Sequence, residues 1–125
     1  SLAEINRQIS QGLMESVNTN LAQQEAYYLA KCGLDLSEAG KSGDKQQMVE
    51  ALDNNQRLWV LIKTLMSSKN SKMPQETKDN LIKLADYVSR NTINLGQNLD
   101  NMDQKMLSCF VNINRQISEG LLGHR

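Results

Sequence analysis

The chain has 125 residues, with 14 basic and 14 acidic side chains and no formal net charge at pH 7. This length suits one domain, and a neutral balance disfavours nucleic acid as a partner, because phosphate binding depends on Lys and Arg. Strand-forming residues are scarce, so we expect an all-α fold, a single-domain bundle of four to five amphipathic helices over residues 1–125. No apolar run approaches the roughly 20 residues of a membrane span, and no signal-peptide pattern is present. We therefore expect a cytoplasmic protein.

Residues 1–20 carry an apolar stripe that predicts an extra N-terminal helix. Within it, residues 5–13 read INRQISQGL, and residues 113–121 read INRQISEGL, so that only Gln11 and Glu119 differ. Three origins remain open: a local duplication, a cloning artefact, or a recombination that copied the last helix to the front. Since the two apolar faces would fit the same groove, we hypothesise that the extra helix pairs with another subunit in a swapped homodimer.

Residues 21–122 are expected to form the main bundle. A first helix is predicted from about residue 21 to 39, and Gly40 to Gly43 form the clearest break, after which Asp44 is placed to cap the next helix. The apolar stripe of that next helix has one polar interruption, Asn55, and recurs at steps of three and four: Met48, Leu52, Asn55, Trp59, Ile62 and Met66. Trp59 is expected to anchor the core, and the alternative is a hot spot in a partner groove.

Two further helices follow the only proline of the chain. Pro74 is expected at a first helical position, where its missing N–H costs nothing, and Gly96 is placed to end that helix. A last helix is predicted over about residues 98–122, with a bundle-like seam. The seam comprises Leu99, Met102, Met106, Cys109, Ile113 and Ile117. Cys32 and Cys109 are expected to be reduced thiols in or beside the core, with a disulfide between them as the alternative.

No pattern in the sequence predicts catalysis, a cofactor or a metal ion. The only histidine is His124, one residue from the end of the chain, so no Ser-His or Cys-His pair is expected. There is neither a Gly-rich phosphate loop nor a metal-ligand spacing. Carboxylates such as Glu50 and Asp53 are expected on solvated helix faces. We therefore expect that the protein is not an enzyme.

Several short elements in a fixed order resemble the FlaF family of flagellar biosynthesis proteins. They are the triplet Arg57-Leu58-Trp59, Asn70 in the turn, the pair Met73-Pro74, and Val88-Ser89-Arg90. The last helix adds an I-N-x-x-I-x-x-G-L pattern, formed by Ile113, Asn114, Ile117, Gly120 and Leu121. The resemblance runs from about Ala26 to Leu121. It departs from the family at Tyr87, where a Trp is frequent, and in the presence of residues 1–20.

The resemblance implies a role in flagellin production and export. It implies binding of flagellin in the cytoplasm as an export chaperone, alongside another flagellar regulator that acts on flagellin mRNA. A helical groove suits this role, because amphipathic helices such as those at the ends of flagellin dock on apolar faces. Tyr28, Met102 and Met106 are the candidate partner surface. The alternatives are a post-transcriptional regulator acting through mRNA or a protein partner, and a plain structural helical interaction module.

Overall fold

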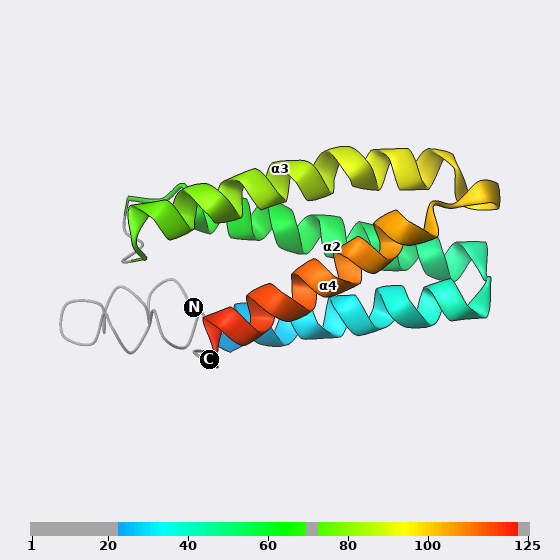
Figure 1. Cartoon of the computed structure of the whole chain (residues 1–125), viewed down its shortest axis with the longest axis horizontal. Helices are drawn as coiled ribbons and strands as arrows, with labels where there is room; N and C mark the ends of the chain where they lie inside the picture. Colours follow the sequence, from blue (N-terminus) through cyan, green and yellow to red (C-terminus); the bar gives the residue numbers. More distant parts are fainter. Residues whose placement is uncertain (1–22, 70–72, 123–125) are drawn as a thin grey trace, which may run out of the picture.

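The computed structural model describes residues 23–69 and 73–122, and these residues form an all-α bundle (Figure 1). Helix runs over residues 23–42, which we call the 23–42 helix, and is followed by α2 (Lys45–Met66), α3 (Gln75–Gln97), the short 3-10 turn η1 (Leu99–Asn101) and α4 (Gln104–Leu121). The predicted fold class is confirmed. The predicted helix over residues 1–20 and the predicted turn residue Asn70 lie outside the described part of the chain.

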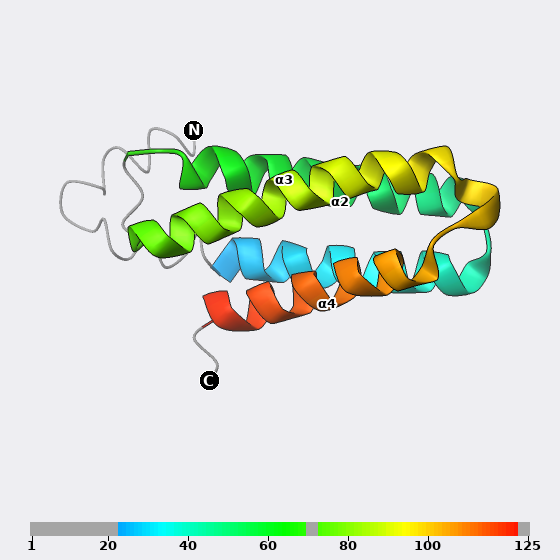
Figure 2. The same ribbon diagram turned by 45° about the horizontal axis from the view of Figure 1, so that its top comes forward.

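Consecutive helices run antiparallel, so that α4 returns alongside the 23–42 helix (Figures 1 and 2). The α2–α3 pair is joined by a hydrogen bond of 2.9 Å from Gln56 Nε2 to Ser89 Oγ and by an exposed ion pair between Lys63 and Asp86. Because α4 runs antiparallel to the 23–42 helix, its last part lies against the beginning of that helix, where Ser118 bonds to the Ala26 carbonyl. This is the up-and-down arrangement expected of a bundle with short connections.

The turn between the 23–42 helix and α2 lies later than predicted. Gly40 is still helical, and Gly43 alone adopts a positive φ, of 69°, which glycine reaches without steric cost. Asp44 caps α2 as expected, because its Oδ1 accepts hydrogen bonds from the backbone N–H groups of Gln46 at 2.9 Å and Gln47 at 3.2 Å.

Both predicted boundaries of α3 also need correction. Pro74 occupies the N-cap position with extended backbone angles, and Gln75 is the first helical residue. The helix continues through Gly96 and ends at Gln97. The helix predicted from residue 98 is interrupted, because Asp103 caps a new helix by accepting a 3.1 Å hydrogen bond from the Met106 N–H.

The core lies where the four helices meet, and Trp59 and Phe110 are its largest fully buried side chains. The residues of α4 that face it differ from the predicted seam: they are Leu107, Phe110, Asn114 and Ser118. The seam residues of α4 lie beside the core and are only half-buried. Within residues 23–69 and 73–122, no helix combines the length and the apolar character needed to cross a bilayer.

Candidate functional site

A buried hydrogen-bond network joins three helices at the centre of the bundle. Trp59 Nε1 of α2 donates to Asn114 Oδ1 of α4 at 3.0 Å. Asn114 Nδ2 in turn donates to Asn55 Oδ1 of α2 at 2.7 Å and to the Leu29 carbonyl of the 23–42 helix at 3.2 Å. All three side chains are fully buried. Because each bond is made in a low-dielectric interior, the network fixes how α4 sits against its neighbours.

Small residues on the 23–42 helix allow α4 to approach closely enough for these bonds. Ala26, Gly33 and Gly40 recur every seven residues along that helix. A Cβ atom built on Gly33 would lie 3.3 Å from the Cβ of Asn114, and one built on Gly40 would lie 2.8 Å from Leu107 Cδ2. The Ser118 hydroxyl donates to the Ala26 carbonyl at 2.6 Å. The 23–42 helix and α4 therefore pack at short distance along the face that carries Ala26, Gly33 and Gly40.

One donor of the network has no partner. Asn55 Nδ2 is buried and makes no hydrogen bond, although Asn55 Oδ1 accepts from Asn114. A buried polar group without a partner costs about 1–3 kcal/mol. Asn55 thus orients the Asn114 side chain through one hydrogen bond, while its own unpaired Nδ2 group lowers the stability of the fold.

The family-signature residues fall into three groups by exposure. Leu58, Trp59, Val88 and Asn114 are buried; Ile113, Ile117 and Leu121 are half-buried; Arg57, Pro74, Arg90 and Gly120 are exposed. Arg57 Nε forms an ion pair of 3.0 Å with Asp53 on the same helix, and exposed pairs of this kind contribute little to stability. The structure therefore brings Trp59 and Asn114 together in the core and leaves the charged signature residues on the surface.

Sequence reasoning singled out Asn114 as a family-signature or core residue, but it missed the hydrogen bonds of Asn114 and the buried position of Ser118. Both are polar residues on the face of α4 that packs inward. A signal was available, since Asn55 interrupts the apolar stripe of α2 in the same way. Two asparagines at otherwise apolar positions are a hint that they pair, because buried polar groups are nearly always hydrogen-bonded.

A row of half-buried apolar side chains begins just before α4 and continues to the last turn of that helix. We call it the α4 apolar line, and it consists of Met102, Met106, Cys109, Ile113, Ile117 and Leu121. Tyr87 of α3 lies over its first half, with its hydroxyl 3.6 Å from Met106 Sδ and 3.9 Å from Cys109 Sγ. This contact with Cys109, followed by burial, raises the pKa of Tyr87. Met102 and Met106, the predicted partner surface, thus belong to a longer apolar surface.

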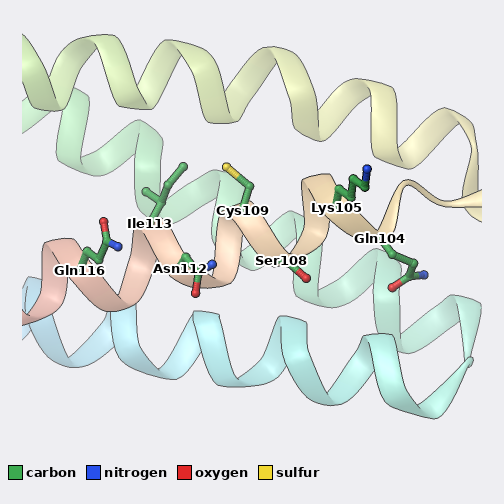
Figure 3. A pocket seen from close by; sticks show the side chains of 7 residues that line it. All are labelled: Gln104, Lys105, Ser108, Cys109, Asn112, Ile113 and Gln116. Atoms are coloured by element: carbon green, nitrogen blue, oxygen red, sulfur yellow. The ribbon is translucent and has the colours of Figure 1, made fainter.

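A shallow pocket of about 610 Å³ opens beside the α4 apolar line. All of its lining residues belong to α4: Gln104, Lys105, Ser108, Cys109, Asn112, Ile113 and Gln116. Figure 3 shows Cys109 and Ile113 on the side of α4 nearer to α3, with Ser108 and Asn112 on the other side. The apolar line is therefore bordered mostly by uncharged polar side chains, with Lys105 as the one charged residue of the pocket lining.

Tyr28, the third residue of the predicted partner surface, lies elsewhere. Its ring is 52% exposed and packs edge-to-face on that of Tyr27, with ring centroids 5.3 Å apart. The next residue, Leu29, bonds to Asn114 near the end of α4, whereas Met102 precedes α4 at its opposite end. The structure does not bring Tyr28 together with Met102 and Met106.

The thiols form no disulfide, since Cys32 and Cys109 are both free. Burial raises the pKa of the Cys32 thiol. Among the residues that the structure describes, no cluster of three or more His, Cys, Asp or Glu side chains could hold a metal ion.

The fold and the buried network define the class of the protein, a small antiparallel helical bundle. The family model described as "Flagellar protein FlaF" matches residues 14–121, and the chain belongs to this family of flagellar proteins. Comparisons with curated proteins and with solved structures gave no match. The matched region contains the second copy of the repeated segment and begins directly after Leu13, where the first copy ends.

Proposed function

We propose that this FlaF-family protein binds flagellin in the cytoplasm and supports its synthesis and export, by binding alone and without catalysis. The observation that carries the proposal is the α4 apolar line. Six apolar side chains, spaced by three or four residues, lie at the edge of the buried core and are only half-buried. A folded monomer gains little from leaving such a row partly in water, so a partner is the simplest reason for it.

The chemistry of the line suits an amphipathic helix. Helix-in-groove recognition uses apolar anchors at helical spacing on both partners. Met102 and Met106 supply flexible, polarisable side chains that adapt to different apolar shapes. The terminal segments of flagellin form amphipathic helices and lack fixed structure before assembly, so they can fold as they bind.

The border of the line favours a protein partner over RNA. Gln104, Ser108, Asn112 and Gln116 beside it are uncharged, and Lys105 is the only cation of the adjoining pocket. The chain as a whole carries no net charge. RNA binding depends on several phosphate contacts from Lys and Arg, and this surface offers few.

Calorimetric titration of the full chain with purified flagellin tests the proposal. We expect a 1:1 complex with a negative heat-capacity change, because apolar surface is buried. Met106→Glu should weaken binding at least about tenfold by placing a charge in the contact, a difference of about 1.4 kcal/mol.

Val60→Glu on α2 is the matched control. Val60 is 50% exposed on α2 and is not part of the α4 apolar line, so this variant should bind flagellin as the wild type does. Circular dichroism establishes that both variants are folded. Equal binding by Met106→Glu would place the contact elsewhere. Binding to the flagellin mRNA leader alone, with steep salt dependence, would replace the proposal by direct RNA regulation.

A further inference from the structure

Residues 113–121, the second copy of the repeated segment, occupy a defined site in the bundle. We call it the α4 seat, and it consists of the Ala26 and Leu29 carbonyls, Gly33, Asn55 and Trp59. Asn114 bonds to Leu29, Asn55 and Trp59, and Ser118 bonds to Ala26. The seat therefore recognises a helix that carries Asn and Ser four residues apart on one face.

Residues 5–13 carry the same recognition pattern. Asn6 corresponds to Asn114 and Ser10 to Ser118, and the half-buried Ile113, Ile117 and Leu121 correspond to Ile5, Ile9 and Leu13. The single difference, Gln11 for Glu119, falls at a position that is exposed in α4. Every side chain of residues 113–121 that meets the α4 seat thus has an identical counterpart in residues 5–13.

The direction of the chain allows residues 5–13 to reach the seat of their own bundle. Ser118 lies at Ala26 and Asn114 at Leu29, so the seated helix runs antiparallel to the 23–42 helix and ends near its beginning. A helix over residues 5–13 with the same polarity would also end there. Residues 14–22 would then connect two antiparallel helices, and such connections need only about 2–8 residues.

We propose that residues 5–13 are a second occupant of the α4 seat, in competition with residues 113–121 of the same chain. Residues 113–121 hold the seat in the structure, and they have an advantage. Their helix continues into Phe110 and Leu107, which are buried in the core, whereas residues 5–13 are preceded by Leu2 in place of Phe110. When the first occupant is weakened or drawn away, the second takes its place and releases the end of the α4 apolar line.

A thermodynamic cycle in the full-length chain tests the competition. Asn114→Ala with Ser118→Ala weakens the first occupant, and Asn6→Ala with Ser10→Ala weakens the second. The pair at residues 6 and 10 alone should change the unfolding midpoint little. Combined with the pair at 114 and 118, it should raise the unfolding equilibrium constant about tenfold more than the product of the two separate factors, because no intact occupant remains.

Arg7→Ala with Gln8→Ala is the matched control, since the equivalent Arg115 and Gln116 are exposed on α4. This control pair should be additive with the changes at 114 and 118. If the fourfold variant does not fold, the same cycle is run with Asn6→Ala and Asn114→Ala alone. Additive effects of the test pair would overturn the proposal. A coupling that grows with protein concentration in sedimentation would also overturn it, because residues 5–13 would then fill the seat of a second copy.

Discussion

Trp59 of α2 and Asn114 of α4 are joined by a 3.0 Å hydrogen bond inside the core, although 55 positions separate them in the sequence. Trp59 belongs to the Arg-Leu-Trp triplet, and Asn114 belongs to the closing I-N-x-x-I pattern. Two of the patterns by which the chain resembles its family therefore meet in one buried contact. They report how the helices pack, and the α4 apolar line lies beside them.

In a chain that also carries Asn6→Ala, so that residues 5–13 cannot replace the lost contacts, Asn114→Ala is expected to destabilise the protein by about 2–6 kcal/mol. The change leaves the buried Trp59 N–H and Asn55 Oδ1 without their shared partner, and each buried group left unsatisfied costs about 1–3 kcal/mol. Urea unfolding followed by circular dichroism measures the difference. Asn112→Ala, on the exposed side of the same helix, should stay within about 0.5 kcal/mol of the wild type.

Two substitutions of Trp59 separate its packing from its hydrogen bond. Trp59→Ala should cost about 3–5 kcal/mol, as large truncations in cores do. Trp59→Phe keeps most of the apolar volume but removes the indole N–H, and should cost about 1–2 kcal/mol. Denaturant unfolding of both variants gives the two values. Wild-type stability for Trp59→Phe would show that the bond to Asn114 contributes nothing net.

Two glycines in helices should respond in opposite directions. Gly33→Val should destabilise the fold, because even its Cβ would lie 3.3 Å from the Asn114 Cβ across a close helix contact. Gly96→Ala should stabilise it by about 0.5–1 kcal/mol, because Gly96 is helical, nothing lies within 4 Å of its Cβ position, and alanine favours helix. Thermal melts of the two variants give the comparison. A stabilising Gly33→Val would contradict the close approach of α4.

Glu25 should make stability depend on pH. Its side chain is buried, and burial raises its pKa above the ordinary value of 4.5. The folded state therefore binds the proton more tightly than the unfolded state, and stability falls as pH rises through the folded pKa. Glu25→Gln should thus raise the melting temperature at pH 7, with a gain that vanishes below pH 4.5. Glu38→Gln, exposed on the same helix, is the control and should show no such trend.

The two thiols should react at different rates in the folded protein. Cys32 is buried and its pKa is raised, so little thiolate is available, whereas Cys109 is half-buried on the α4 apolar line. A thiol-specific reagent such as Ellman's should modify Cys109 first and Cys32 only on unfolding. Cys109→Ser should abolish the early reaction. Bound flagellin should slow it if the proposed contact is correct.

The sequence predicted the helices well and their boundaries less well. The spacing of apolar residues placed α2, and Asp44 placed its cap, because both signals are local. Gly40 and Gly96 were interpreted as helix ends, whereas both are helical. A glycine that admits a neighbouring helix and a glycine that ends a helix look alike in sequence. Only the packing of α4 on the 23–42 helix distinguishes Gly40.

The face of α4 that enters the core was predicted incorrectly for a related reason. The predicted seam, from Leu99 to Ile117, was expected to pack inward, but Asn114 and Ser118 lie on the inward face of α4 with Leu107 and Phe110. Hydrophobicity favours the predicted seam. The row that contains Asn114 and Ser118 packs inward instead, because its polar groups form hydrogen bonds with two other helices, and those partners are distant in sequence.

The buried link between Trp59 and Asn114 has a consequence for genetics. Changes at either residue increase the unfolded fraction, and cells degrade unfolded chains, so such changes would lower the amount of protein before they altered any contact. A genetic screen would therefore recover such changes for lack of protein. Substitutions on the α4 apolar line that leave cellular abundance unchanged are the ones whose phenotypes test the proposed recognition of flagellin.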